Sequence, residues 1–174
     1  MSQVEWWLRG PVAGVPAPLM PVAHALLQTA DDVAAALAPL TLDEIWLRPD
    51  DAAGSCGFHA LHVAGSTDRL FTYARGETLS ERQRQALATE RDPGERLPAD
   101  ALVRAVREAM ERAVDQLRAT DPARLQDERK VGRAALPATT LGLLFHAAEH
   151  AQRHAGQITT TSRIVAARRG LASS

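Results

Sequence analysis

The sequence is short of cysteine, and its positive and negative charges nearly cancel. Cys56 is the single cysteine among 174 residues, so the chain forms no internal disulfide. Its free thiol suits a reducing compartment. Lys plus Arg number 20 against 21 Asp plus Glu, which gives no electrostatic reason to expect nucleic acid or an anionic membrane as the main partner. We therefore expect a cytoplasmic protein with neither a nucleic-acid nor a membrane partner.

Long apolar runs and strand patterns are also missing. No segment approaches the ~20 apolar residues of a membrane span, and the start, MSQVEWWLR, lacks the apolar core of a signal peptide. Alternating runs of β-branched and aromatic residues, which are typical of strands, do not occur, nor does an internal repeat. Only 4% of residues are aromatic, but 45% are hydrophobic, enough for a core. The length predicts a single all-α domain over residues 1–174.

Ten prolines divide the chain into stretches with helical spacing. The spacing predicts four long helices: from about Pro21 to Pro39, from a cap at Ser55 to Gly76, from Pro98 to Asp121, and from Pro137 to Gly170. The third carries the clearest apolar stripe, formed by Leu102, Val106, Met110, Val114 and Leu117. The pattern favours a four-helix bundle.

Two segments lie outside these helices. Residues 1–20 are rich in Gly and Pro and are expected to form an extended strap, with Trp6 and Trp7 packed on the bundle. The loop over residues 77–97, between the second and third helices, is too long for a plain hairpin connection. Within it, the sequence SERQRQALATE favours a short exposed helix.

Histidines are the main functional clue, because five of the six fall in two groups on the second and fourth helices. His150 and His154 are four residues apart, so their rings lie ~6 Å apart along a helix and can converge on one ion. On a helical wheel both share a face with Leu143 and Ala147, whereas Glu149 lies on the charged side. The spacing favours a pair of metal ligands facing the core.

A third ligand is expected from the second helix, since catalytic zinc sites usually take three protein ligands. His62 is the best candidate, because Phe58, Ser66 and Arg69 put an aromatic ring, a hydroxyl and a cation on its face, which is too polar for an ordinary core face. The pattern leaves a hydrogen-bonded histidine cluster open as the alternative. Other residues take secondary roles: His59, His146 and Asp31 as candidate proton relays, and His24, Phe58, Ser66 and Arg69 as candidate pocket lining. We interpret Cys56 as a helix-start residue, with no basic partner to make it a nucleophile.

Two segments resemble a known family. GFHALHVAGSTDRLFTY resembles the second helix of the DinB-like (YfiT-like) metal-dependent hydrolases, and HAAEHAQRHAGQI resembles that family's fourth-helix signature. The resemblance implies a four-helix bundle, commonly dimeric, with Zn or Ni held by His62, His150 and His154. It also adds Gln157 to the candidate pocket lining. The chain departs from the signature around the last ligand, where Arg153 and Ala155 stand in place of the usual His-Arg pair.

These observations lead to two competing functional hypotheses. In the first, a three-histidine divalent metal site activates water or a low-molecular-weight thiol, for hydrolysis or thiol transfer on a small molecule. Arg69 would then hold an anionic group of the substrate, and no obvious general base is present. In the second, the protein is a non-catalytic dimeric helical stress-response protein whose metal is structural or adventitious. An open three-ligand site favours the first hypothesis, and a closed four-ligand site favours the second.

Overall fold

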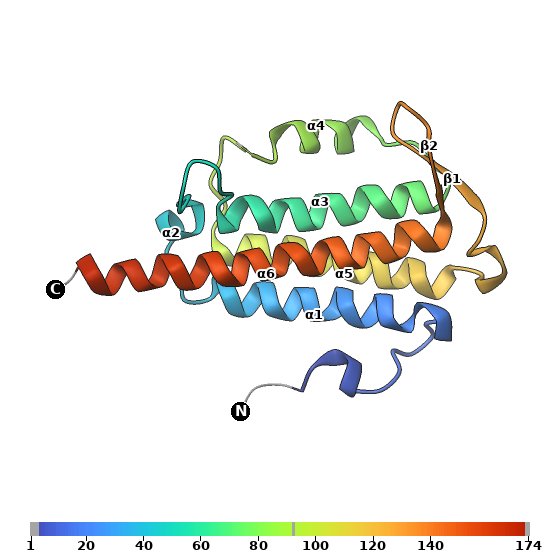
Figure 1. Cartoon of the computed structure of the whole chain (residues 1–174), viewed down its shortest axis with the longest axis horizontal. Coiled ribbons are helices and arrows are strands. Elements are labelled where there is room, and N and C mark those ends of the chain that lie inside the picture. Colours follow the sequence, from blue (N-terminus) through green and yellow to red (C-terminus); the bar gives the residue numbers. More distant parts are fainter. Residues whose placement is uncertain (1–3, 92, 173–174) are drawn as a thin grey trace.

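Four long helices lie side by side in the computed structural model, which describes residues 4–91 and 93–172 (Figure 1). They are α1 (Met20–Leu37), α3 (Cys56–Ala74), α5 (Ala99–Ala119) and α6 (Thr140–Ala172). Helix α6 packs against both α3 and α1, and α5 packs against the same two helices. This arrangement confirms the predicted four-helix bundle.

The core between these helices is aliphatic. The five residues of the predicted α5 stripe are all buried, as expected from their recurrence on one face of a helix. Ala147, Ala151 and Ala155 are buried along α6. Such small side chains let neighbouring helices approach closely.

Local sequence signals set the helix ends as predicted. The Ser55 hydroxyl accepts a hydrogen bond from the Phe58 amide at 3.1 Å and caps α3. Gly76, with φ +82°, follows the end of this helix, where a left-handed residue without a Cβ is favoured. Pro98 stands at the N-cap of α5, and Pro21 lies in the first turn of α1.

A two-stranded hairpin corrects the expectation that the chain contains no strand. Strands β1 (Glu128–Val131) and β2 (Leu136–Thr139) pair antiparallel, with Lys130 opposite Pro137. In a two-stranded sheet both strands are edges, so a proline can be accommodated. The strands are four residues long and largely exposed, too short for an alternating apolar pattern. The predicted start of the fourth helix near Pro137 was therefore wrong, because residues 136–139 form β2 and α6 begins at Thr140.

The short helix α2 (Leu42–Trp46) was not predicted either. Its first turn is closed by a capping box, in which the Thr41 hydroxyl accepts from the Glu44 amide and the Glu44 carboxylate accepts from the Thr41 amide. Five residues are too few for a helical apolar period. The Thr-x-x-Glu spacing is therefore the only sequence signal for this helix.

The N-terminal strap only partly behaves as expected. The Trp6 indole donates to Asp31 of α1 at 2.8 Å, so Trp6 does pack on the bundle. Trp7 is 63% exposed and donates to Glu5, so its predicted packing was wrong. The strap is also not fully extended, because 3-10 turns form at Trp6–Leu8 and Ala17–Leu19.

Helix α4 (Glu81–Thr89) confirms the short exposed helix predicted in the second connection. It lies outside the bundle alongside α3 (Figure 1), and none of its residues is buried. Across the described ranges, every helix is too short or too polar to cross a bilayer.

Candidate metal centre

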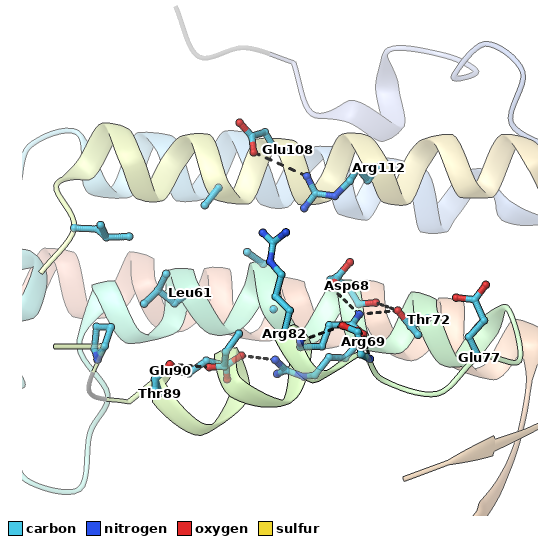
Figure 2. Close-up of a pocket in the computed structure, with 18 of the residues that line it drawn as sticks. Leu61, Asp68, Arg69, Thr72, Glu77, Arg82, Thr89, Glu90, Glu108 and Arg112 are labelled. Carbon is cyan, nitrogen blue, oxygen red and sulfur yellow. Dashed lines mark hydrogen bonds and ion pairs between the residues drawn. The ribbon is translucent and has the colours of Figure 1, made fainter. Parts of the chain in front are cut away.

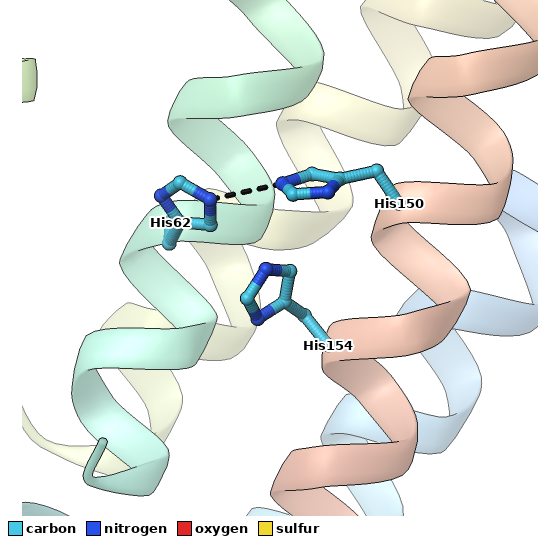
Figure 3. Close-up of side chains that lie close together, drawn as sticks. All are labelled: His62, His150 and His154. Atoms are coloured by element: carbon cyan, nitrogen blue, oxygen red, sulfur yellow. Dashed lines mark hydrogen bonds between the residues drawn. The ribbon is translucent and has the colours of Figure 1, made fainter. Parts of the chain in front are cut away.

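The three predicted ligand histidines converge between α3 and α6 (Figure 3). His62 comes from α3, and His150 and His154 come from α6, one turn apart. One ring nitrogen of each lies within 4.8 Å of those of the other two. The Nε2 atoms of His62 and His150 are 2.9 Å apart. Helical spacing on α6 and the packing of α6 against α3 are together sufficient to form the group.

Glu90 supports His62 from outside the triad. Its Oε2 lies 2.8 Å from His62 Nδ1, and Arg69 Nη1 donates to its other carboxylate oxygen. Burial opposes ionisation of Glu90, but the hydrogen bonds from His62 and Arg69 outweigh burial and hold its pKa below the ordinary value. An ionised Glu90 favours a proton on His62 Nδ1, which leaves the Nε2 lone pair directed at the other two histidines.

Sequence reasoning missed Glu90. It follows α4, a polar segment without apolar periodicity, and only the three-dimensional structure places it beside His62. The one available signal was Arg69, a cation on the face of His62 that would need a carboxylate partner if buried. The structure buries Arg69 and Glu90 together, with 7% exposure each.

His59 supports His154 in a similar way. Their Nδ1 atoms are 2.9 Å apart, and His59 is buried at the start of α3. Burial, reinforced by neighbouring His62, lowers the pKa of both rings to about 4. The pKa of His150 is also lowered, chiefly by burial. These histidines are therefore neutral near pH 7, the form that binds metal ions.

The chemistry of this group fits a divalent cation. Neutral imidazole nitrogens are preferred ligands of Zn²⁺ and Ni²⁺. The Nδ1 atom of His150 is buried and lacks a hydrogen-bond partner in the described chain, so direct hydrogen bonding does not fully satisfy the cluster. Three histidines are partly exposed and converge, which provides three ligands and leaves room for a fourth from solvent.

Aromatic and charged side chains surround the triad. Phe58 stacks on His62 with ring centroids 5.6 Å apart, and the exposed Arg91 guanidinium lies 5.3 Å from the Phe58 ring centroid. The exposed His146 contacts Glu149 at 2.7 Å, and Arg153 also donates to Glu149. Glu149 thus belongs to a surface charge network, consistent with its place on the helical wheel.

The remaining predicted residues lie in different surroundings. His24 contacts the Gly10 carbonyl at 2.9 Å, and the buried Ser66 hydroxyl donates to the Val63 carbonyl. Gln157 is exposed on α6, and Asp31 binds Trp6. Cys56 is fully buried, and burial raises its pKa to about 11, which disfavours a reactive thiolate.

A cavity of about 920 Å³ lies between α3, α4 and α5 (Figure 2). The three histidines do not line it. Arg69 and Glu90 do, and Glu90 therefore stands between the cavity and His62. The cavity also receives Arg82 from α4 and Arg112 from α5, so it is polar and charged.

Comparisons with solved structures support the fold. A conserved protein from Enterococcus faecalis superposes with a TM-score of 0.70 at 17% identity, covering 86% of this chain and 97% of the other. The colibactin self-resistance protein ClbS, solved in complex with a dsDNA, superposes with a TM-score of 0.57 at 15% identity, covering 80% of this chain and 92% of ClbS. At these identities the likeness establishes the fold alone.

The ClbS complex corrects one expectation from the sequence. We excluded nucleic acid as a partner because the formal net charge is -1. That exclusion was wrong, since a protein with this fold has been solved on double-stranded DNA. Net charge averages over the whole surface, whereas nucleic acid contacts a local patch.

Comparison with families is more specific. No curated protein matches the sequence significantly. The family model of the DinB superfamily, however, matches residues 25–158, which include all three converging histidines. The chain therefore belongs to the DinB superfamily.

Proposed function

We propose that this protein is a metal-dependent enzyme in which His62, His150 and His154 hold a divalent cation, Zn or Ni. The observation that carries the proposal is the convergence of three imidazoles from two helices, two of which, His150 and His154, have pKa values lowered chiefly by burial. The alternative, a histidine cluster held only by hydrogen bonds such as the one between His62 and His150, predicts that the purified protein takes up no divalent cation.

The surrounding residues have separable roles in this proposal. Glu90 and His59 orient the rings of His62 and His154 through their Nδ1 atoms. Phe58 covers one side of His62 and limits access of water. Bound in the triad, a divalent cation would supply Lewis-acid chemistry, lowering the pKa of a water molecule or a thiol toward neutrality.

We assign the proposed reaction to hydrolysis or thiol transfer on a small molecule, with a low-molecular-weight thiol as one candidate substrate. An anionic group of the substrate would be attracted by Arg91, which is exposed beside Phe58 and close to the triad. Arg69, to which sequence reasoning gave that role, is paired with Glu90. A homodimer and a cytoplasmic location are part of the same proposal.

A structural metal remains the contrasting proposal. Structural zinc sites usually have four protein ligands and are closed, whereas this group has three partly exposed histidines. The three histidines are also not part of the buried aliphatic core. Both features favour a catalytic ion.

His150→Ala separates the two functions. If the ion is catalytic, the variant loses bound metal, measured by elemental analysis, and loses turnover, while its melting temperature stays close to that of the metal-free wild type. If the ion is structural, chelation of the wild-type protein lowers its melting temperature by many degrees. Ester, amide and thiol-conjugation substrates are screened with the metal-loaded protein. A stable metal complex without turnover on any of them would contradict the enzyme proposal.

A further inference from the structure

The residue that supports His62 follows a helix that adds nothing to the buried core. Glu90 directly follows α4, which contributes no buried side chain to the core. Helix α4 is attached to α3 through polar contacts: Gln83 donates to Asp68 at 2.7 Å and to Thr72 at 2.8 Å, and Glu90 binds Arg69 and His62. The position of Glu90 therefore depends on how α4 docks.

A glycine in α3 makes room for the Glu90 carboxylate. A Cβ added at Gly65 would overlap Glu90 Oε1 and lie 2.8 Å from Arg69 Nη1. Glycine inside a helix costs about 1 kcal/mol relative to alanine, so its presence needs a local reason. The reason is the Glu90 carboxylate, which occupies the space that a side chain at residue 65 would need.

We propose that Glu90 is a positioning residue for His62, that Gly65 is its socket, and that docking of α4 thereby sets the affinity of the triad for a divalent cation. The inference rests on the proposed metal site and identifies what controls it. Removing a carboxylate that orients a ligand histidine typically weakens metal affinity about 10- to 100-fold. Glu90 contacts Nδ1 of His62, whereas Nε2 of the same ring faces His150, so Glu90 would act on a bound cation through His62.

Two variants test the proposal by different routes. Glu90→Gln removes the charge and keeps the size. Gly65→Ala leaves Glu90 and every histidine intact but displaces the carboxylate, which can move because it is the end of a flexible side chain. The matched controls are Glu81→Gln, an exposed carboxylate of α4 paired with Arg84, and Gly156→Ala, where an added Cβ meets open space.

Zinc affinity, measured with Zn²⁺ alone by competition against a chelating dye, is the first measurement. Both test variants are expected to bind zinc about 10- to 100-fold more weakly than wild type, and both controls as tightly as wild type. The second measurement is histidine ¹⁵N NMR of the metal-free protein. Wild-type His62 is expected to carry its proton on Nδ1. The hydrogen bond to Glu90 should shift the resonance of this Nδ1–H group downfield, and the shift should be lost in Gly65→Ala and reduced in Glu90→Gln.

The outcomes separate this inference from the proposed function. If wild type binds no zinc, the proposed metal site fails, and the NMR signal of His62 still decides the role of Glu90. If wild type binds zinc and both test variants match it with unchanged His62 signals, the positioning role is overturned while the metal site stands. Unfolding of both variants would also overturn the inference, because Glu90 would then support the fold rather than the ligand.

Discussion

His59 and His154 share a hydrogen bond between their Nδ1 atoms, which lie 2.9 Å apart. One of the two nitrogens must donate and the other accept, so the tautomers of the rings are coupled. If His154 binds a cation through Nε2, its Nδ1 carries the proton and His59 accepts it. His59, on the opposite helix, therefore selects the form of His154 that can be a ligand.

Replacing His59 by phenylalanine tests this coupling. The variant fills the buried position but removes the acceptor, so we expect zinc affinity to fall by about tenfold or more. Isothermal titration of the metal-free variant with zinc measures the change. His24→Gln, which alters a histidine outside the cluster, is the control. Equal affinity of His59→Phe and wild type would show that the contact does not orient His154.

Acid should destabilise the metal-free protein before it titrates the carboxylates. The pKa values of His59 and His154 fall from 6.5 to about 4 on folding, so the unfolded chain binds more protons than the folded chain between these values. Stability is then lost as pH falls from about 6.5 toward 4. Melting temperatures in chelator at pH 7.5 and pH 5.0 should differ by several degrees. The His59→Phe, His154→Phe double variant should show a smaller difference, and an unchanged one would refute this assignment.

Loosening α4 should weaken metal binding without touching the triad or Glu90. Gln83→Ala removes two hydrogen bonds from α4 to α3, each contributing about 0.5–1.5 kcal/mol, and also the capping contact in which the Gln83 amide oxygen accepts from the Ser80 amide. Because undocking of α4 withdraws Glu90, we expect zinc affinity to fall several-fold and amide exchange over residues 81–89 to accelerate. Gln85→Ala, whose side chain contacts Glu81 of the same helix, should change neither. Faster amide exchange together with wild-type zinc affinity would show that docking of α4 does not control metal binding.

Cys56 should be inert in the folded protein. It is fully buried, and its pKa is raised to about 11, so little thiolate is present at pH 7.5. Alkylation by iodoacetamide, followed by mass spectrometry, should be very slow in buffer and fast in denaturant. Rapid native labelling would reopen a nucleophilic role for this thiol.

The oligomeric state can be measured directly. The resemblance to the DinB-like family implies a homodimer, so light scattering should give about twice the 18.8 kDa of one chain. Phe145 on α6, which is 60% exposed in the single chain, offers an apolar contact for a second copy. A mass of 18.8 kDa at all workable concentrations would contradict the dimer.

Helical periodicity accounts for what could be predicted of the fold. The α5 stripe repeats often enough to define a face, and Ser55, Gly76 and Pro98 mark helix ends through local backbone chemistry. The hairpin at residues 128–139 and the five-residue α2 were missed, because elements of four or five residues contain too little periodic signal. Trp7 was misplaced because an aromatic residue in a strap can pack on the bundle or face solvent.

For the candidate site, too, helical spacing predicted some residues and missed others. The spacing of His150 and His154 is fixed by one helix, and the polar face of α3 identified His62. Glu90 could not be found in this way, since its distance from His62 depends on how a polar connection folds back over α3. Local geometry predicts ligands on a helix, whereas supporting residues from loops require the tertiary structure.

The separation of the histidines along the chain also determines when the site can form. His62 meets a partner 88 residues further on, and His150 and His154 both lie in α6, which follows α3 and α5 in the chain. While the chain is growing, α3 can present His62 and Glu90 but has no counterpart for them. If the triad holds a cation as proposed, loading follows synthesis of α6, and a product truncated before His150 would lack two of the three ligands.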